Sequence, residues 1–238
     1  MGTIGEREAA SQHFAPLLDL TERLRNNNLS DTALTSITNI YRHEGNWQAA
    51  RANCDRGFEM GRQTSTLLAT RVMMEYETGD FGQGGVYLGR LLELMHAVPP
   101  GANWEHGYPA MVIPVVARIT GEINRLETAQ AAAETVLSSS TATPHISWWA
   151  RIGLGLIAVL RSGVRAAEEQ YGYLKMMTGV ISRAIANDRL LGLLAQTMGN
   201  LDQATIHFDD ALAFCRKAGY RPELAWTCCD YADLLLQR

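Results

Sequence analysis

The sequence predicts an all-α protein, a right-handed superhelix of about five helix pairs with an extra helix at each end. Two observations favour this class. Apolar residues recur with helical spacing along most of the 238 residues. Turn-forming glycines recur at intervals of 34, 42, 42 and 36 residues, at Gly45, Gly79, Gly121, Gly163 and Gly199. Repeats of this size are typical of stacked helix pairs, each of which needs its neighbours to bury its apolar face.

We expect one domain over residues 1–238. It begins with a leading helix at 6–27 and a polar turn, RNNNLSD, in which Ser30 caps the next helix. The helix pairs then follow at about 31–61, 64–96, 108–140, 145–177 and 187–218, with a final helix at 222–237.

Each pair has the same internal pattern, most clearly at 189–222. An apolar helix precedes the turn glycine, here Gly199, and a helix with small residues follows it. Gly192 and Ala204 let the two helices approach closely, and Phe208 fills the space between neighbouring pairs. Cationic residues followed by Gly219 then end the second helix.

Three features depart from the repeat. The Pro-rich segment 97–109, which contains Trp104, is either an exposed connection or a cover over the open face of the array. Segment 178–187 is either a longer connection or an extended helix. Trp148 and Trp149 point in different directions on one helix, so either both pack in the core or one contacts a ligand or partner.

Composition excludes several classes of protein. With a net charge of −4 and no basic run, the chain does not resemble a nucleic-acid-binding protein. Its apolar stretches are too short to span a membrane, and the first residues do not form a signal peptide. We therefore expect a cytoplasmic protein without nucleic-acid or membrane partners.

No catalytic, metal or cofactor site is predicted. The sequence lacks the phosphate-binding GxxxxGK[ST] loop, the GxSxG nucleophile motif and HExxH, and its six histidines are scattered. The glycines of GDFGQGG at 79–85 are explained by the repeat. Adjacent Cys228 and Cys229 are either small apolar residues or a redox pair. Adjacent Asp209 and Asp210 are expected on a solvated helix face.

The stretch 188–236 resembles the tetratricopeptide-repeat superfamily. It carries Leu191-Gly192, then Ala204 and Phe208 four residues apart, then Pro222. More narrowly, it resembles the long-repeat C-terminal arrays of bacterial ATPase or adenylate-cyclase-like proteins and of MalT/LuxR-type signalling proteins. The resemblance covers roughly 30–238 at the level of the repeat. It implies a scaffold or sensor role and brings no catalytic residues.

A binding site is expected on the concave face, which the first helix of each pair lines. With the glycines as register, the groove residues are Asn39, Arg42, Met73, Tyr76, Met111, Arg118, Arg189, Gln196 and Asp233. The three arginines suit a carboxylate or phosphate. In the alternative interpretation, each arginine is solvated or pairs with an acidic residue of the chain.

The final helix lacks the polar surface that usually caps an array. Trp226, Tyr231 and Leu235 predict either self-association as a homodimer through this end or a module of a longer protein.

The leading functional hypothesis is a non-catalytic scaffold in bacterial signalling or transcriptional regulation. Its concave face would hold a protein or peptide, or covalently linked signalling domains. The alternative is a small-molecule sensor coupled to an ATPase, cyclase or DNA-binding module. A long open groove would favour the peptide, whereas a compact pocket closed by Trp104 or Trp148 would favour the sensor.

Overall fold

The computed structural model describes residues 12–13, 16, 20, 27–61 and 63–237. Every regular element in this part is helical, which confirms the all-α class. The predicted leading helix at 6–27 lies mostly outside the described residues. The predicted turn with Ser30 as a cap is wrong, because a helix already begins at Asn27.

The described part contains eleven helices, joined mostly by short turns. They are α2 (Asn27–Glu44), α3 (Trp47–Glu59), α4 (Ser65–Glu77), α5 (Phe81–Ala97), α6 (Trp104–Thr120), α7 (Leu126–Ser138), α8 (Pro144–Leu160), α9 (Val164–Leu174), α10 (Asn187–Thr197), α11 (Leu201–Ala218) and α12 (Arg221–Leu236).

Two helices, α2 and α6, begin four residues before their expected boundaries. Helix α6 begins at Trp104 rather than 108, because the Asn103 side chain accepts a hydrogen bond from the backbone N–H of His106 at 3.0 Å and caps it. Pro109 therefore lies inside the helix, although proline usually marks a break. Only residues 98–103 connect α5 to α6, so Trp104 belongs to a helix rather than to a loop.

Three of the turns share one construction. A glycine with positive φ ends the first helix, and the next residue, Asn or Asp, caps the second through its side chain. The pairs are Gly45-Asn46, Gly79-Asp80 and Gly199-Asn200. The expected turn at Gly163 differs. There Ser162 has the positive φ, 51°, and Gly163 is the residue before α9.

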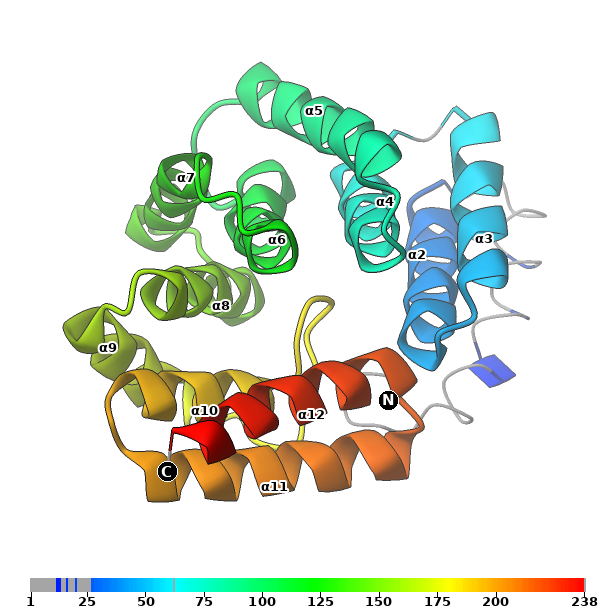
Figure 1. Ribbon diagram of the computed structural model, residues 1–238. Helices are drawn as coiled ribbons and strands as arrows, with labels where there is room; N and C mark the ends of the chain where they lie inside the picture. The colour runs from blue at the N-terminus through cyan, green and yellow to red at the C-terminus, as the bar shows by residue number, and fades with distance from the viewer. Residues whose placement is uncertain (1–11, 14–15, 17–19, 21–26, 62, 238) are drawn as a thin grey trace.

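Figure 1 shows the helices arranged as a ring. In it α4, α6, α8 and α10 lie on the inside and α5, α7, α9 and α11 on the outside. The last helix, α12, contacts α2 near the start of the ring. Pro222 lies beside Gly45, and the ring of Tyr220 is 5.1 Å from that of His43. The connection between α9 and α10 enters the ring as a hairpin, drawn in yellow.

The largest core cluster draws its residues from both the inner and the outer helices. The predicted close approach near Gly192 is present, since a Cβ there would meet the Phe208 ring at 2.9 Å. Trp148 and Trp149 are 7% and 3% exposed, which confirms that both pack in the core. Trp148 donates its indole N–H to Asn187 at 3.3 Å, so its polar edge has a partner.

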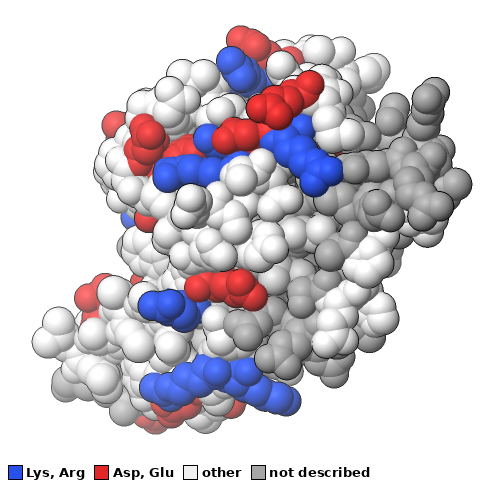
Figure 2. All heavy atoms as spheres, turned by 90° about the vertical axis from the view of Figure 1, so that its right-hand side faces the viewer, with Lys and Arg blue, Asp and Glu red and all other residues white. Residues whose placement is uncertain are grey.

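Charges of both signs share the face formed by α3. Arg71 pairs with Asp55 and Glu75, and Glu75 also pairs with Arg51. Figure 2 shows basic and acidic side chains next to each other on this side of the molecule. Within the same residues, every helix is too short or too polar to cross a lipid bilayer.

Candidate functional site

The three arginines predicted for the concave groove all form ion pairs within the chain. Arg42 pairs with Glu77. Arg118 donates to one oxygen of Asp230 at 2.7 Å, and Arg189 to the other at 2.6 Å. Arg189 also pairs with Glu223, 3.1 Å away. We expected these guanidinium groups to bind a carboxylate or phosphate of a ligand, but acidic side chains of the chain itself bind them.

The other predicted groove residues do not share an open surface. Met73 and Met111 are fully buried, and Asn39 donates to the carbonyl of Thr35. Tyr76 is partly buried and stacks on Phe81. Gln196 donates to Gln237, and Asp233 is exposed on α12.

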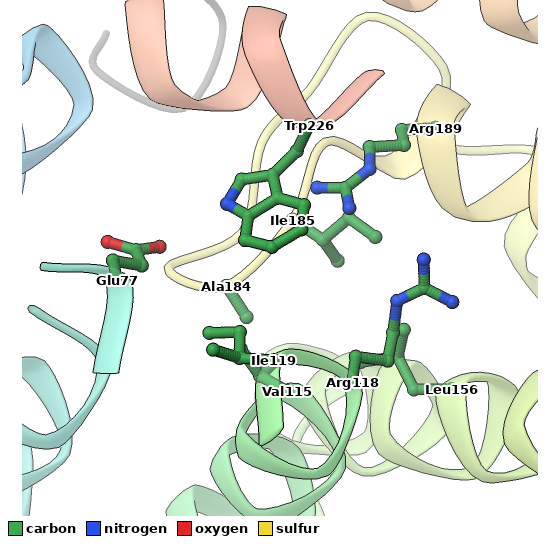
Figure 3. A pocket seen from close by; sticks show the side chains of 9 residues that line it. All are labelled: Glu77, Val115, Arg118, Ile119, Leu156, Ala184, Ile185, Arg189 and Trp226. Atoms are coloured by element: carbon green, nitrogen blue, oxygen red, sulfur yellow. The ribbon is translucent and has the colours of Figure 1, made fainter. Parts of the chain in front are cut away.

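The cavity lined by the predicted groove residues Arg118 and Arg189 is small. Figure 3 shows Arg118, Arg189 and Trp226 turned toward a space that Ala184 and Ile185 of the hairpin help to fill. The remaining cavity is about 20 Å³, which holds about one water molecule. Trp226, expected on a free apolar end, therefore lines the interior.

The hairpin at 175–186 is built locally and anchored at both sides. The Ser182 hydroxyl donates to the carbonyl of Ile185 at 2.9 Å and accepts from two backbone N–H groups, which closes the turn. Arg42 of α2 donates to the carbonyl of Arg183, and Ala186 donates to Glu223 of α12 at 2.7 Å. The hairpin thus joins the first and last described helices.

The side chain of Arg183 reaches a hollow at the starts of α4, α6 and α8. The hollow has a volume of about 420 Å³, within the range of small-molecule sites. Its lining combines hydroxyl groups, aromatic rings and charges: Asp31, Thr32, Thr35, Thr64, Ser65, Thr66, Trp104, Glu105, Tyr108, His145, Trp149 and Arg183. The first turns of three helices meet here, where backbone N–H groups favour negative charge.

One wall of the hollow is an aromatic cluster. The Trp149 ring lies 4.9 Å from Trp104, 4.8 Å from Tyr108 and 4.9 Å from His145, between ring centroids. Trp149 and Tyr108 are buried, whereas Trp104 remains 38% exposed. Trp104 is therefore the ring that can stack on a ligand.

The guanidinium of Arg183 is positioned over this wall but lacks a full set of partners. Its central carbon lies 5.7 Å from the Trp149 ring centroid. Its Nη1 atom is buried and donates no hydrogen bond. Because buried polar atoms are nearly always paired, this nitrogen is an exception among the buried polar atoms. A negative charge also lines the hollow, that of Glu105. Its carboxylate accepts a hydrogen bond from the Ser65 hydroxyl at 3.2 Å.

The titratable rings of the hollow are uncharged at neutral pH. Burial lowers the pKa of His145, and the positive charge of Arg183 lowers it further. Burial raises the pKa of Tyr108. The positive charge in the hollow is therefore that of Arg183, and the acids are Asp31 and Glu105.

Sequence reasoning found part of this site. Trp104 was named as a residue that could close a pocket, and it lines this hollow. Arg183 was missed, because the hairpin that carries it has no repeat pattern. Comparison of the chain with protein-family models, curated proteins and solved structures found no match.

Proposed function

We propose that this protein is a regulatory domain that binds a small organic acid in the hollow beside Arg183. The observation that carries the proposal is the buried, unpaired Nη1 of Arg183 above an aromatic wall with an exposed tryptophan. A carboxylate or phosphate supplies the missing acceptor, and guanidinium groups bind both well.

The lining also constrains the rest of the ligand. Trp104 offers a flat apolar surface, which favours a planar ring. Glu105 and the neighbouring hydroxyl groups accept hydrogen bonds, which favours N–H or O–H donors on that ring. The ligand class is therefore an amino- or hydroxyl-substituted aromatic acid, of a size that fits about 420 Å³.

The position of Arg183 supports a sensing role. Its side chain faces the hollow, whereas its carbonyl accepts from Arg42 of α2. On the same hairpin, Ala186 donates to Glu223 of α12. A ligand that pulls on Arg183 would act on the hairpin that joins the two ends of the ring. Such a ligand shifts the protein's conformation only to the extent that it binds one arrangement more tightly.

We expect Arg183→Gln to weaken the binding of aromatic acids at least about tenfold. Isothermal titration of 4-aminobenzoate and 4-hydroxybenzoate, each beside its neutral carboxamide, measures the contribution of the acid group. The wild-type protein should bind each acid at least about tenfold more tightly than its amide, since a charge-assisted hydrogen bond contributes about 1.5–3 kcal/mol. The variant should lose this difference, because a neutral side chain cannot pair with the acid.

The matched control is Arg165→Gln, which removes the same charge from an exposed position on α9. It should bind the acids as the wild type does. Equal affinity of acid and amide for the wild type, or equal losses in both variants, would reject the proposed site. The Arg42 contact uses the carbonyl of Arg183, so the substitution leaves the hairpin anchor in place.

We further propose that the ring is a tetratricopeptide-like superhelix closed on itself. The protein would act in the cytoplasm of a bacterium. There it would regulate a signalling module without catalysing a reaction. The Gly-Asx turns and the alternation of inner and outer helices support the repeat assignment. The small cavity beside Arg118 and Arg189, where the peptide groove was expected, favours the sensor over a peptide-binding scaffold.

A second role, self-association through the end of α12, is favoured by Leu235 and Leu236, which are 56% and 86% exposed. Tyr231 instead stacks on Phe208 and is only partly exposed. If two copies pair through this end, Leu235→Glu should convert a dimer to a monomer in size-exclusion chromatography with light scattering. Ile123→Glu, at an equally exposed aliphatic residue, should leave the mass unchanged. A wild-type monomer would exclude this role.

A further inference from the structure

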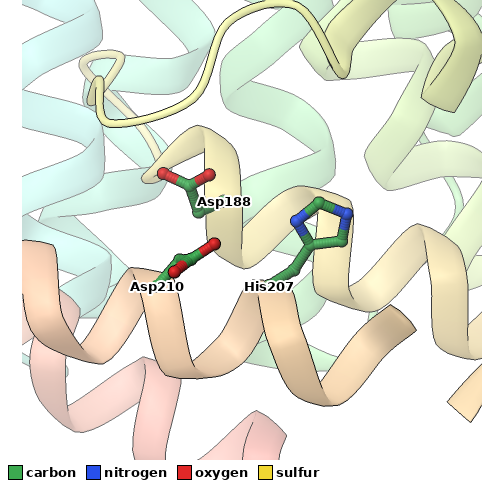
Figure 4. Close-up of side chains that lie close together, drawn as sticks. All are labelled: Asp188, His207 and Asp210. Atoms are coloured by element: carbon green, nitrogen blue, oxygen red, sulfur yellow. The ribbon is translucent and has the colours of Figure 1, made fainter. Parts of the chain in front are cut away.

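Three potential metal ligands converge away from the hollow, where α10 packs against α11. Asp188 lies in the first turn of α10, and His207 and Asp210 lie one turn apart on α11 (Figure 4). One nitrogen or oxygen atom from each side chain lies within 4.8 Å of the others. Residues three apart share a helix face, and the packing of the two helices brings Asp188 onto that face.

Two of the three side chains are buried with an unpaired atom. Asp188 is 1% exposed and His207 is 7% exposed. Oδ1 of Asp188 and Nδ1 of His207 form no hydrogen bond. Figure 4 shows one ring nitrogen of His207 turned toward the two carboxylates. Leaving such atoms unpaired costs about 1–3 kcal/mol each, so their common direction indicates a shared partner.

The remaining atoms of these side chains are already held in place. Oδ2 of Asp188 accepts from the backbone N–H of Gly179 at 2.7 Å. Nε2 of His207 lies 2.8 Å from the Tyr171 hydroxyl and 3.2 Å from Nε2 of Gln203. When Nε2–H donates to Tyr171, Nδ1 keeps its lone pair for a metal. Metal-binding histidines typically have such a partner on the second nitrogen.

The electrostatics of the cluster also favour a cation. Burial raises the pKa of Asp188, and the charge of Asp210 raises it further. No Lys or Arg of the described residues is among the groups that shift the pKa of Asp188. Burial lowers the pKa of His207.

We infer that Asp188, His207 and Asp210 bind one divalent transition-metal ion, for which zinc fits best. Carboxylate oxygen and imidazole nitrogen together suit zinc, whereas calcium and magnesium prefer oxygen alone. Zinc–ligand bonds of about 2.0–2.2 Å are compatible with three ligand atoms that lie within 4.8 Å of one another. Asp210 is exposed, so its side chain can rotate to close the site and leave one position to water.

The test is zinc titration of the chelator-treated full chain by calorimetry. Cys228 and Cys229 are exposed and free, so both are replaced by serine in every variant to remove competing thiols. This background should bind one zinc ion per chain. Asp210→Asn should weaken binding at least about tenfold, because it removes a direct ligand. Asp209→Asn is the matched control, since it removes the neighbouring exposed carboxylate and should change affinity less than about twofold.

Thermal unfolding gives a second readout that does not depend on the calorimetric fit. Zinc should raise the melting temperature of the background and of Asp209→Asn, but not that of Asp210→Asn, because a ligand stabilises only the state that binds it. Absence of stoichiometric zinc binding would overturn the inference. So would equal losses in Asp209→Asn and Asp210→Asn, or tighter binding of calcium than of zinc.

Discussion

Replacing Arg189 with methionine is expected to lower the free energy of unfolding by about 3–5 kcal/mol. The guanidinium of Arg189 is buried between Asp230 and Glu223, at 2.6 and 3.1 Å. Without it, two buried carboxylates remain, with Arg118 bonded to only one of them. Because a buried unpaired charge is costly, the variant should unfold at a lower urea concentration, followed by circular dichroism of the helices.

The loss of stability in Arg189→Met should depend on pH. Burial already raises the pKa of Glu223, and removal of Arg189 raises it further. An acid whose pKa is higher in the folded state than in the unfolded state destabilises the fold as pH rises through the interval between the two values. The deficit of the variant should therefore shrink as the pH falls below neutral and Glu223 becomes protonated.

Arg165→Met provides the control, because it removes an exposed arginine from α9. Its stability should stay within about 0.5 kcal/mol of the wild type. A change below about 1 kcal/mol for Arg189→Met would show that the network of α6, α10 and α12 does not hold the ring closed.

Local signals in the sequence were enough to predict the helices and most of their turns. Gly45-Asn46 shows why: a glycine suited to positive φ and an amide suited to capping lie next to each other. The same reasoning failed at Gly163, where Ser162 takes the strained conformation instead. It also failed at Trp104, because Asn103 starts a helix that continues through Pro109.

The candidate site was harder to predict, because it depends on how far the array curves. Arg42 meets Arg183 across 141 residues, and nothing in either local segment specifies that contact. The register placed Met73 and Met111 on the inner helices, but it did not predict that the ring would close and a hairpin would fill its centre. The spacing of His207 and Asp210 was visible, whereas the contribution of Asp188 required the packing of α10 against α11.

Gly153→Ala is expected to lower the free energy of unfolding by at least about 3 kcal/mol, the upper range for overpacking a core. Gly153 lies on α8 where the helix touches the backbone of α6. A Cβ there would collide with the carbonyl oxygen of Ala110 and lie 3.4 Å from the backbone nitrogen of Met111. Backbone atoms of a packed helix cannot move aside as a flexible side chain can, so α6 and α8 must separate.

Gly155→Ala isolates this effect, because it adds the same methyl group to the same helix two residues later. The nearest atom to its Cβ would be Cδ2 of Leu190 at 3.5 Å, an ordinary contact. Both substitutions gain up to about 1 kcal/mol of helix propensity, so their difference in urea unfolding measures the packing clash. Gly155→Ala should be as stable as the wild type or more so. If Gly153→Ala behaves in the same way, the two helices can separate at little cost, and their close contact does not determine the curvature of the ring.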